Sequence, residues 1–175
     1  MKEVLVIDIQ GSGKTRLIEV LTDFAKSGEK DLSEVEIINQ SLNTNGVELT
    51  NITVGKEKIL LREIGGSLKP LWIDFFERSQ FIMFVVDVSD YAQIPSAVCE
   101  IIELISNPDS KNINILIVLN KIDIDHSILI EEIQMQLRLD SLEDNNRLRI
   151  NFVEVSALLG INIGIIYKWL EFAQS

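Results

Sequence analysis

The residues from Asp8 to Thr15 combine glycines, a lysine and a threonine between an apolar run and a segment with helical spacing. Gly11 and Gly13 allow the backbone to approach an anion so closely that several N–H groups can point at its oxygens. A helix that begins here adds a partial positive charge. Lys14 can neutralise β- and γ-phosphates, and the Thr15 hydroxyl can bind Mg²⁺, which prefers oxygen ligands. The spacing predicts a phosphate-binding loop formed by Gly11, Ser12, Gly13, Lys14 and Thr15.

This loop departs from the usual pattern at its first position, where Asp8 replaces a glycine. Aspartate tolerates a left-handed backbone better than most residues, so the turn can survive the replacement. We expect the carboxylate of Asp8 to point away from the phosphates, because otherwise the affinity for them would fall. The alternative interpretation is an ordinary Gly-Ser turn before a helix.

A second motif, Asn120-Lys121-Ile122-Asp123, follows another apolar run and contains groups that can read a guanine base. Asp123 can accept two hydrogen bonds, from the ring N1–H and the exocyclic amine, whereas adenine lacks both donors in that arrangement. Unpaired acceptors in the site would reject the wrong base. Lys121 can lay its aliphatic stem along the base, and Asn120 can tie this loop to the phosphate loop. The alternative is a charged strand-to-helix turn.

A third segment, Ser156-Ala157, follows the last apolar run of the chain. The backbone N–H of Ala157 could meet the guanine oxygen. This pair of residues is weak evidence alone, but three such loops at the ends of three strands, in this order, predict a guanine nucleotide site.

The elements that position these loops are read from short apolar runs rich in isoleucine and valine. The runs Val4–Ile9, Phe81–Val88 and Ile113–Leu119 lack polar alternation, which is typical of parallel strands buried on both faces. Val47–Ile52 and Lys58–Ile64 flank a turn-rich tetrapeptide and predict an antiparallel hairpin at the sheet edge. Ile150–Val155 is the expected last strand.

Segments with helical spacing alternate with these strands. We expect helices at Lys14–Lys26, Pro95–Ser106, a short stretch around Ile130–Leu137, and Ile161–Phe172. The side chains of Met135, Ile165, Ile166, Trp169, Leu170 and Phe172 are expected in the core. The pattern predicts one α/β domain over residues 1–175, a three-layer sandwich with a six-stranded, mostly parallel sheet and one antiparallel edge strand. Ligands in such sheets bind beyond the carboxyl ends of the strands.

Composition restricts the classes of function. Sixteen Lys and Arg against 27 Asp and Glu give a formal net charge of −11, which repels a phosphate backbone and disfavours nucleic-acid binding. No apolar run approaches the roughly 20 residues of a membrane span, and the N-terminal Met1-Lys2-Glu3 is unlike a signal peptide or an acylation site. We expect no direct membrane anchor in this chain. A single cysteine, Cys99, fits a reducing compartment and a cytoplasmic location.

Taken together, the motifs resemble those of small GTPases of the ADP-ribosylation factor (Arf) group over essentially the whole chain. The double glycine followed by Pro-Leu-Trp is more diagnostic of the Arf branch than of other small GTPases, and Glu-Ile-Gly-Gly with three residues before the proline is similar to a divergent Arf-like branch. The matching segments are Asp8–Thr15, Thr44–Gly46, Glu63–Gly66, Pro70–Trp72, Asn120–Asp123 and Ser156–Ala157.

The resemblance implies roles for two switch segments that respond to the nucleotide. Thr44 would be the switch I threonine, which binds Mg²⁺ together with Thr15 and senses the γ-phosphate, and the N–H of Gly66 in switch II would bind the same phosphate. In the family the intervening hairpin slides in register between nucleotide states. Sliding in this chain is a hypothesis, because the sequence shows only the hairpin.

Departures from the family pattern bear on catalysis. Glu63 replaces an aspartate that reaches Mg²⁺ through water, and Ser67 replaces the glutamine that orients the attacking water. Switch II is also about two residues shorter than in typical Arf proteins. Serine is too short to orient water in the same pose, so we expect very slow GTP hydrolysis and assign no catalytic residue.

The resemblance also places an effector-binding surface on the hairpin and switch II, at Val47, Arg62 and Phe75 with Trp72 nearby. Arg62 replaces an aromatic residue and should change the set of partners, which would include an exchange factor and an activating protein. The leading hypothesis is a GTP-binding molecular switch with weak hydrolysis, using GTP, GDP and Mg²⁺. The alternative is a scaffold that binds GTP permanently. A third hypothesis is a P-loop kinase, but such an enzyme would have no use for the guanine-reading motif Asn120–Asp123.

Overall fold

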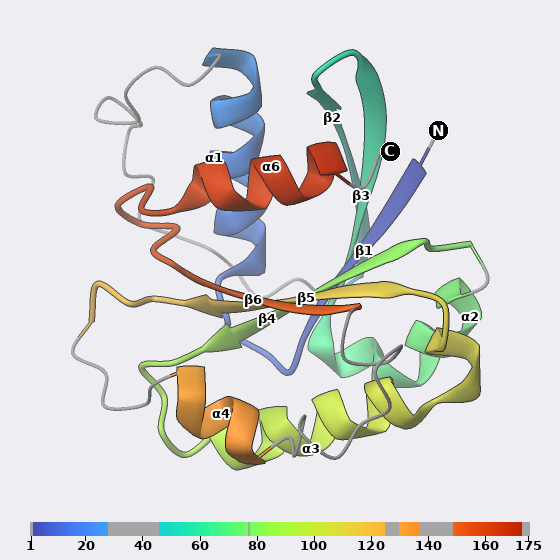
Figure 1. Ribbon diagram of the computed structural model, residues 1–175, viewed down its shortest axis with the longest axis vertical. Coiled ribbons are helices and arrows are strands. Elements are labelled where there is room, and N and C mark those ends of the chain that lie inside the picture. Colours follow the sequence, from blue (N-terminus) through green and yellow to red (C-terminus); the bar gives the residue numbers. More distant parts are fainter. Residues whose placement is uncertain (1, 28–45, 77, 125–129, 137–148, 173–175) are drawn as a thin grey trace.

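The computed structural model of the chain describes residues 2–27, 46–76, 78–124, 130–136 and 149–172. A six-stranded sheet lies between two layers of helices (Figure 1). Its strands are β1 (Lys2–Asp8), β2 (Val47–Val54), β3 (Glu57–Ile64), β4 (Phe81–Asp87), β5 (Asn114–Asn120) and β6 (Ile150–Val155). The helices are α1 (Lys14–Ser27), α2 (Trp72–Phe76), α3 (Ile94–Ser106), α4 (Ile130–Gln136) and α6 (Ile163–Phe172), with short 3₁₀ helices η2 (Gly66–Leu71) and η3 (Pro108–Ser110).

The strands follow the order β2-β3-β1-β4-β5-β6 across the sheet. The pair β2–β3 is antiparallel, and every other neighbouring pair is parallel. The predicted α/β sandwich with an antiparallel strand at one edge is therefore confirmed. Because β1, β4, β5 and β6 all run in the same direction, the loops that follow them emerge at one edge of the sheet.

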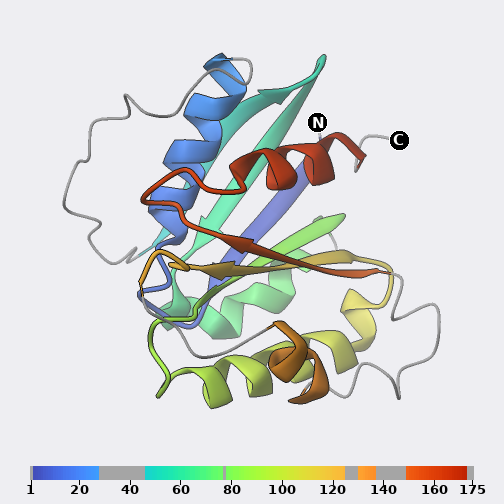
Figure 2. The same ribbon diagram turned by 60° about the vertical axis from the view of Figure 1, so that its left-hand side comes forward.

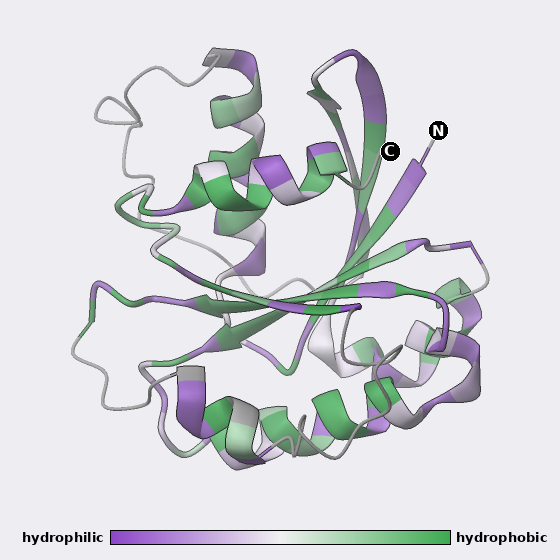
Figure 3. Cartoon of the chain, viewed as in Figure 1, coloured by the Kyte–Doolittle hydropathy of each residue, from purple (hydrophilic) through white to green (hydrophobic). Residues whose placement is uncertain are grey.

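Helices cover both faces of the sheet. The views in Figures 1 and 2 place α1 and α6 on one face and α2, α3 and α4 on the other. Strand β1 shows why both faces are apolar: Leu5 and Ile7 pack in the cluster beneath α3, whereas Val4 and Val6 pack in the cluster beneath α1. Successive side chains of a strand point to opposite faces, so a strand covered twice needs an uninterrupted apolar run. Hydropathy colouring shows these central strands as largely hydrophobic (Figure 3).

The hairpin β2–β3 turns through the two residues Gly55 and Lys56. Gly55 has a φ of 60°, which favours glycine in two-residue hairpin turns. Its N–H donates a hydrogen bond to the hydroxyl of Tyr167 on α6 at 2.9 Å. The hairpin tip is therefore joined to the last helix.

Some side chains that helical spacing assigned to the core are exposed. They are Ile165 (51% exposed), Met135 (75%) and Phe172 (81%). In α6 the fully buried residues are Ile163, Ile166 and Leu170, spaced by three and four positions. A narrow stripe of this kind leaves Ile165 on the flank of the helix. Among the described residues, no helix is long and apolar enough to cross a bilayer.

Candidate functional site

The predicted phosphate loop connects the end of β1 to the start of α1 at Lys14. Gly11 and Gly13 have φ values of 72° and 83°, which glycine adopts without strain. A Cβ on Gly13 would lie 2.8 Å from Nδ2 of Asn120, so this glycine also permits close contact with the loop after β5. The strand–loop–helix arrangement agrees with the sequence prediction.

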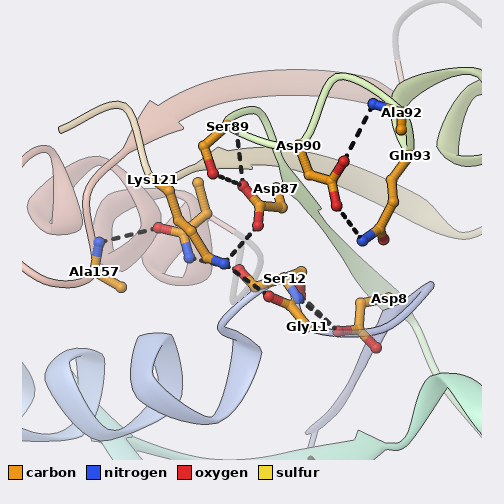
Figure 4. Close-up of polar contacts among 11 residues, drawn as sticks. Asp8, Gly11, Ser12, Asp87, Ser89, Asp90, Ala92, Gln93, Lys121 and Ala157 are labelled. Carbon is orange, nitrogen blue, oxygen red and sulfur yellow. Dashed lines mark hydrogen bonds and ion pairs between the residues drawn. The ribbon is translucent and has the colours of Figure 1, made fainter. Parts of the chain in front are cut away.

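Asp8 is fully buried at the end of β1, and its carboxylate is turned toward the phosphate loop rather than away from it (Figure 4). Its Oδ2 accepts hydrogen bonds from the Ser12 hydroxyl at 2.6 Å and the Ser12 N–H at 3.4 Å. Its Oδ1 lies 3.0 Å from Nζ of Lys14. The expected orientation of Asp8 is thus wrong, because the loop itself supplies donors that attract the carboxylate. Positive φ is found at Gly11 and Gly13, and not at Asp8.

A second carboxylate, Glu63 at the end of β3, meets the same lysine. Glu63 is 3% exposed, and its Oε1 lies 3.7 Å from Nζ of Lys14, which is itself 5% exposed. The Thr15 hydroxyl donates a hydrogen bond to that same Oε1. The longer side chain of glutamate therefore brings its oxygen directly to the predicted Mg²⁺ ligand. A hydroxyl and a carboxylate oxygen in contact form a donor set that fits Mg²⁺.

The segment predicted to be switch II begins with a close backbone contact at Gly66. A Cβ on Gly66 would lie 2.1 Å from the carbonyl oxygen of Ile9 and 2.9 Å from that of Asp8. Only glycine can occupy this position without moving η2 away from the phosphate loop. Ser67 follows on the exposed side of η2, and Thr44 lies outside the described residues.

The loop after β5 is joined to the two other loops through one buried amide, Asn120. Its Nδ2 donates to the carbonyl of Ser12 at 2.8 Å, and its Oδ1 accepts from the N–H of Ala157 at 3.0 Å. The predicted tie between the base-reading and phosphate loops is present. The N–H of Ala157, which the sequence analysis expected at the guanine oxygen, lies against Asn120 in this structure.

Asp123 is held by the loop after β6. Its Oδ1 accepts a hydrogen bond of 2.5 Å from the hydroxyl of Ser156, and that hydroxyl oxygen accepts one of 3.0 Å from the N–H of Leu159. Ser156 is fully buried. The carboxylate of the predicted base reader is therefore oriented by a residue of the third loop.

Lys121 links the base-reading loop to two further segments. It adopts a left-handed backbone with φ 71°, and its ammonium donates to the carbonyl of Gly11 at 2.9 Å and to Oδ2 of Asp87 at 2.5 Å (Figure 4). Asp87 Oδ1 accepts from the N–H and hydroxyl of Ser89. Burial raises the pKa of Asp87, but the hydrogen bonds from Lys121 and Ser89 outweigh it, and the net pKa is lowered.

Asp87 and Ser89 contribute to the site although no sequence motif predicted them. Both follow the apolar residues of β4, and the sheet order places β4 directly beside β5. A polar Asp-Val-Ser at the carboxyl end of a buried strand was the available signal.

The predicted effector surface is partly present. Val47 is 39% exposed. The guanidinium of Arg62 pairs with Glu3 of β1 at 2.6 and 3.2 Å and lies 4.8 Å from the ring centroid of Phe75. The hydrogen bond to Glu3 raises the pKa of Arg62. Its charge is therefore compensated within the fold.

Trp72 does not belong to the exposed part of this surface. It is 4% exposed, and its ring packs edge-on against Phe84 of β4 at a centroid distance of 6.1 Å. Because α2 lies over the sheet, the indole points into the core and not toward a partner.

Comparison with known proteins agrees with this site. The model of the ADP-ribosylation factor family matches residues 2–173. The chain is 30% identical to ADP-ribosylation factor-like protein 16 of Homo sapiens, over 95% of this chain and 83% of the relative. It is 27% identical to ADP-ribosylation factor-like protein 5A of Mus musculus, over 82% of this chain and 74% of the relative.

A solved structure shares the fold. The Arl6 BBS3 small GTPase of Trypanosoma brucei, solved with the nucleotide analogue GppNp, superposes with a TM-score of 0.76 at 19% identity, covering 98% of this chain and 96% of that one. The shared fold and the match across nearly the whole chain support guanine nucleotide binding. The chain belongs to the ADP-ribosylation factor family of small GTPases.

Proposed function

We propose that this chain is a GTP-binding molecular switch that binds Mg-GTP and Mg-GDP, presents its switch segments to effector proteins and hydrolyses GTP very slowly. One observation carries the proposal: the buried amide of Asn120 joins the loops after β1, β5 and β6 through Ser12 and Ala157. These are the loops whose residues suit phosphate and guanine recognition. Their connection supports a single site that contains both kinds of residue.

The phosphate end binds charge through three kinds of group. The backbone N–H groups of Gly11–Thr15 face a polyphosphate, and Lys14 neutralises part of its charge. Thr15, Glu63 and the Thr44 of switch I would hold the metal. When bound, Mg²⁺ offsets the negative charge of the β- and γ-phosphates. Gly66, packed against Ile9, brings the switch II backbone toward the γ-phosphate position.

The base end supplies specificity. Asp123 accepts hydrogen bonds from the guanine N1–H and amine, and Ser156 fixes the direction of its carboxylate. Lys121 is held beside the loop by Gly11 and Asp87, so its stem can cover the base. The N–H of Ala157 would donate to both the Oδ1 of Asn120 and the guanine oxygen. An adenine would leave these groups unpaired.

The proposed hydrolysis is slow because Ser67 cannot orient water as glutamine does. The hydroxyl is attached directly to Cβ, and the residue is exposed on η2. In single-turnover measurements we expect a rate well below that of an ordinary Arf protein. A rate equal to such a protein, with Ser67 unaltered, would refute this part of the proposal.

Binding is tested by titrating the full chain with fluorescent GDP, GTP and ADP in the presence of Mg²⁺. We expect guanine nucleotides to bind at least about 100-fold more tightly than ADP, because the Asp123 carboxylate would accept two hydrogen bonds that adenine cannot donate. Equal affinity for the two bases would overturn the proposal. Nucleotide dissociation rates with and without Mg²⁺ distinguish a switch, which exchanges, from a permanently loaded scaffold, which nothing in the comparisons favours.

Effector binding is the part of the proposal that concerns Val47, Arg62 and Phe75. Exchange factors and activating proteins would act on the same switch segments in the cytoplasm. The charge of Arg62 is mostly enclosed by Glu3 and Phe75, so we expect partners to contact the apolar side chains around it. Substituting Val47 with Asp should abolish capture of an effector by the GTP-loaded chain without altering nucleotide affinity.

A further inference from the structure

The carboxylate of Asp8 is the least expected feature of the phosphate loop. It stands at a position that needs no side chain, and it is fully buried. It receives two donors from Ser12 and an ion pair from Lys14. A backbone N–H, a hydroxyl and an ammonium are the groups that such a loop offers to a phosphate. The chain therefore supplies its own anion to the donors of the loop.

We propose that Asp8 is a built-in counterion that occupies Lys14 and holds the phosphate loop in shape when no nucleotide is bound, so that nucleotide phosphates bind in competition with it. The inference rests on the proposed nucleotide site and assigns Asp8 a positioning role there. Lys14 lies 3.0 Å from Asp8 and 3.7 Å from Glu63. A phosphate that takes the lysine must replace or share the nearer of these contacts.

The charge balance of this cluster has a second consequence. Asp8, Glu63 and Lys14 are 0%, 3% and 5% exposed, so water screens them little. Two carboxylates against one ammonium leave an excess of negative charge where a polyphosphate has to bind. A divalent cation between Thr15 and Glu63 would reverse this excess. Nucleotide affinity should thus depend more strongly on Mg²⁺ in this chain than in a variant without the Asp8 charge.

The proposal predicts that substitution of Asp8 lowers the stability of the nucleotide-free chain but raises its affinity for nucleotide. Asp8→Asn removes the charge and keeps the shape, and Asp8→Gly restores the residue usual in the motif. Without nucleotide, Lys14 loses its nearest partner in either variant, and breaking one side of a buried pair destabilises the fold. With nucleotide, the competitor is gone and the phosphates bind more tightly. If Asp8 only stabilised the loop, its replacement would lower both the stability of the nucleotide-free chain and the affinity for nucleotide.

The experiment uses the full chain freed of nucleotide with a chelator and a phosphatase. Melting temperatures are measured for the wild type, Asp8→Asn, Lys14→Met and the double variant. We expect Asp8→Asn to lower the melting temperature by roughly 5–10 °C, and the double variant to lose clearly less than the sum of the single ones. Additive losses would overturn the pairing of Asp8 with Lys14.

Affinity for fluorescent GDP is then measured with saturating Mg²⁺ and again with chelator. We expect Asp8→Asn and Asp8→Gly to bind GDP roughly 10-fold more tightly than the wild type or better, and their ratio of affinities with and without Mg²⁺ to be several-fold smaller. Unchanged or weaker binding in both variants would overturn the competition.

A matched control removes one carboxylate on a different element, helix α1. Asp23→Asn changes the net charge equally, and Asp23 is a half-exposed residue of α1 whose ion pair with Lys26 spans 3.6 Å. It should alter neither melting temperature nor affinity, so a shift equal to that of Asp8→Asn would mean a general charge effect and overturn the inference. If no variant binds guanine nucleotide at all, the proposed function fails, while the melting series still tests the Asp8–Lys14 pair.

Discussion

The two ends of the candidate site are built from the same kinds of residue but differ in how their charges are compensated. At the base end, Asp87 pairs with Lys121, and Asp123 accepts from a serine hydroxyl. At the phosphate end, Asp8 and Glu63 share one lysine. The side chains of the base end are thus held in place by contacts within the fold. The phosphate end lacks a positive charge that a metal ion could supply.

This difference indicates which part of the site has diverged. The loops that would recognise guanine keep the pattern of the family, and their hydrogen bonds connect three segments far apart in the sequence. The unusual residues, Asp8, Glu63 and Ser67, all lie where phosphates would bind or react. We therefore expect that mutations can change recognition of the base and binding of the phosphates separately.

Breaking the base end should have the largest effect on binding. Asp123→Asn removes the charge that accepts the two guanine donors and places an amide N–H near one of them. At about 1.5 kcal/mol for each hydrogen bond to a charged group, GDP affinity should fall by roughly 100-fold or more, with little change for ADP. Competition titrations measure this. Asp109→Asn, an exposed residue of η3, should leave GDP affinity unchanged.

Gly66→Ala should break the contact between switch II and the phosphate loop. The added Cβ would meet the Ile9 carbonyl oxygen at 2.1 Å, and backbone on both sides cannot yield cheaply. We expect a cost of about 1–3 kcal/mol in unfolding free energy. Because the N–H of Gly66 would bind the γ-phosphate, which GDP lacks, the preference for GTP over GDP should also drop by roughly 10-fold or more. Gly46→Ala is the matched control, because nothing lies within 4 Å of its added Cβ. Equal effects of both changes would contradict the packing argument.

Asp87→Asn should remove the ion pair with Lys121 that compensates the charges at the base end. The change removes a charged partner of Lys121 and should cost about 1–2 kcal/mol of unfolding free energy at pH 7. The pKa of Asp87 in the fold is lowered from 3.8. The carboxylate therefore makes its full contribution to the free energy of unfolding above pH 3.8, and this contribution is lost as the pH falls through the lowered pKa of the folded state. The stability gap between wild type and variant should therefore stay constant from pH 7 to about 5 and narrow below about 4. A gap that widens in acid would exclude this assignment.

Glu63→Asp should have the smallest effect, and it sharpens the comparison at the phosphate end. Shortening the side chain withdraws its oxygen from the Thr15 hydroxyl. We expect a loss of about 1 kcal/mol in unfolding free energy without nucleotide, the usual worth of one hydrogen bond. Chemical denaturation of the nucleotide-free chain measures it. Glu57→Asp, an exposed residue at the start of β3, serves as the control.

Sequence reasoning located the loops because each is a local motif next to a local apolar run. It missed what depends on neighbours across the sheet. Arg62 was expected as a charge in an effector patch, and its partner could not be foreseen: β3 lies parallel to β1, and this brings Glu3 within 2.6 Å. Asp87 reaches Lys121 only because β4 and β5 are adjacent.

The direction in which a side chain points could likewise not be predicted from the local sequence pattern. Asp8 could be recognised as unusual from its position in the motif, yet the donors that turn it inward, Ser12 and Lys14, come together only when the loop folds back. Trp72 was expected near the effector surface, and its burial depends on how α2 docks against Phe84. Spacing along one helix cannot decide such contacts.

The hydrogen bond from Gly55 to Tyr167 gives the hairpin tip a fixed neighbour on the C-terminal helix. If the hairpin slides in register along β1, as the family resemblance suggests, each residue of sliding moves its tip by about 3.3 Å, and this bond breaks. The tyrosine would then report, from the opposite end of the molecule, which phosphate state the distant loops hold.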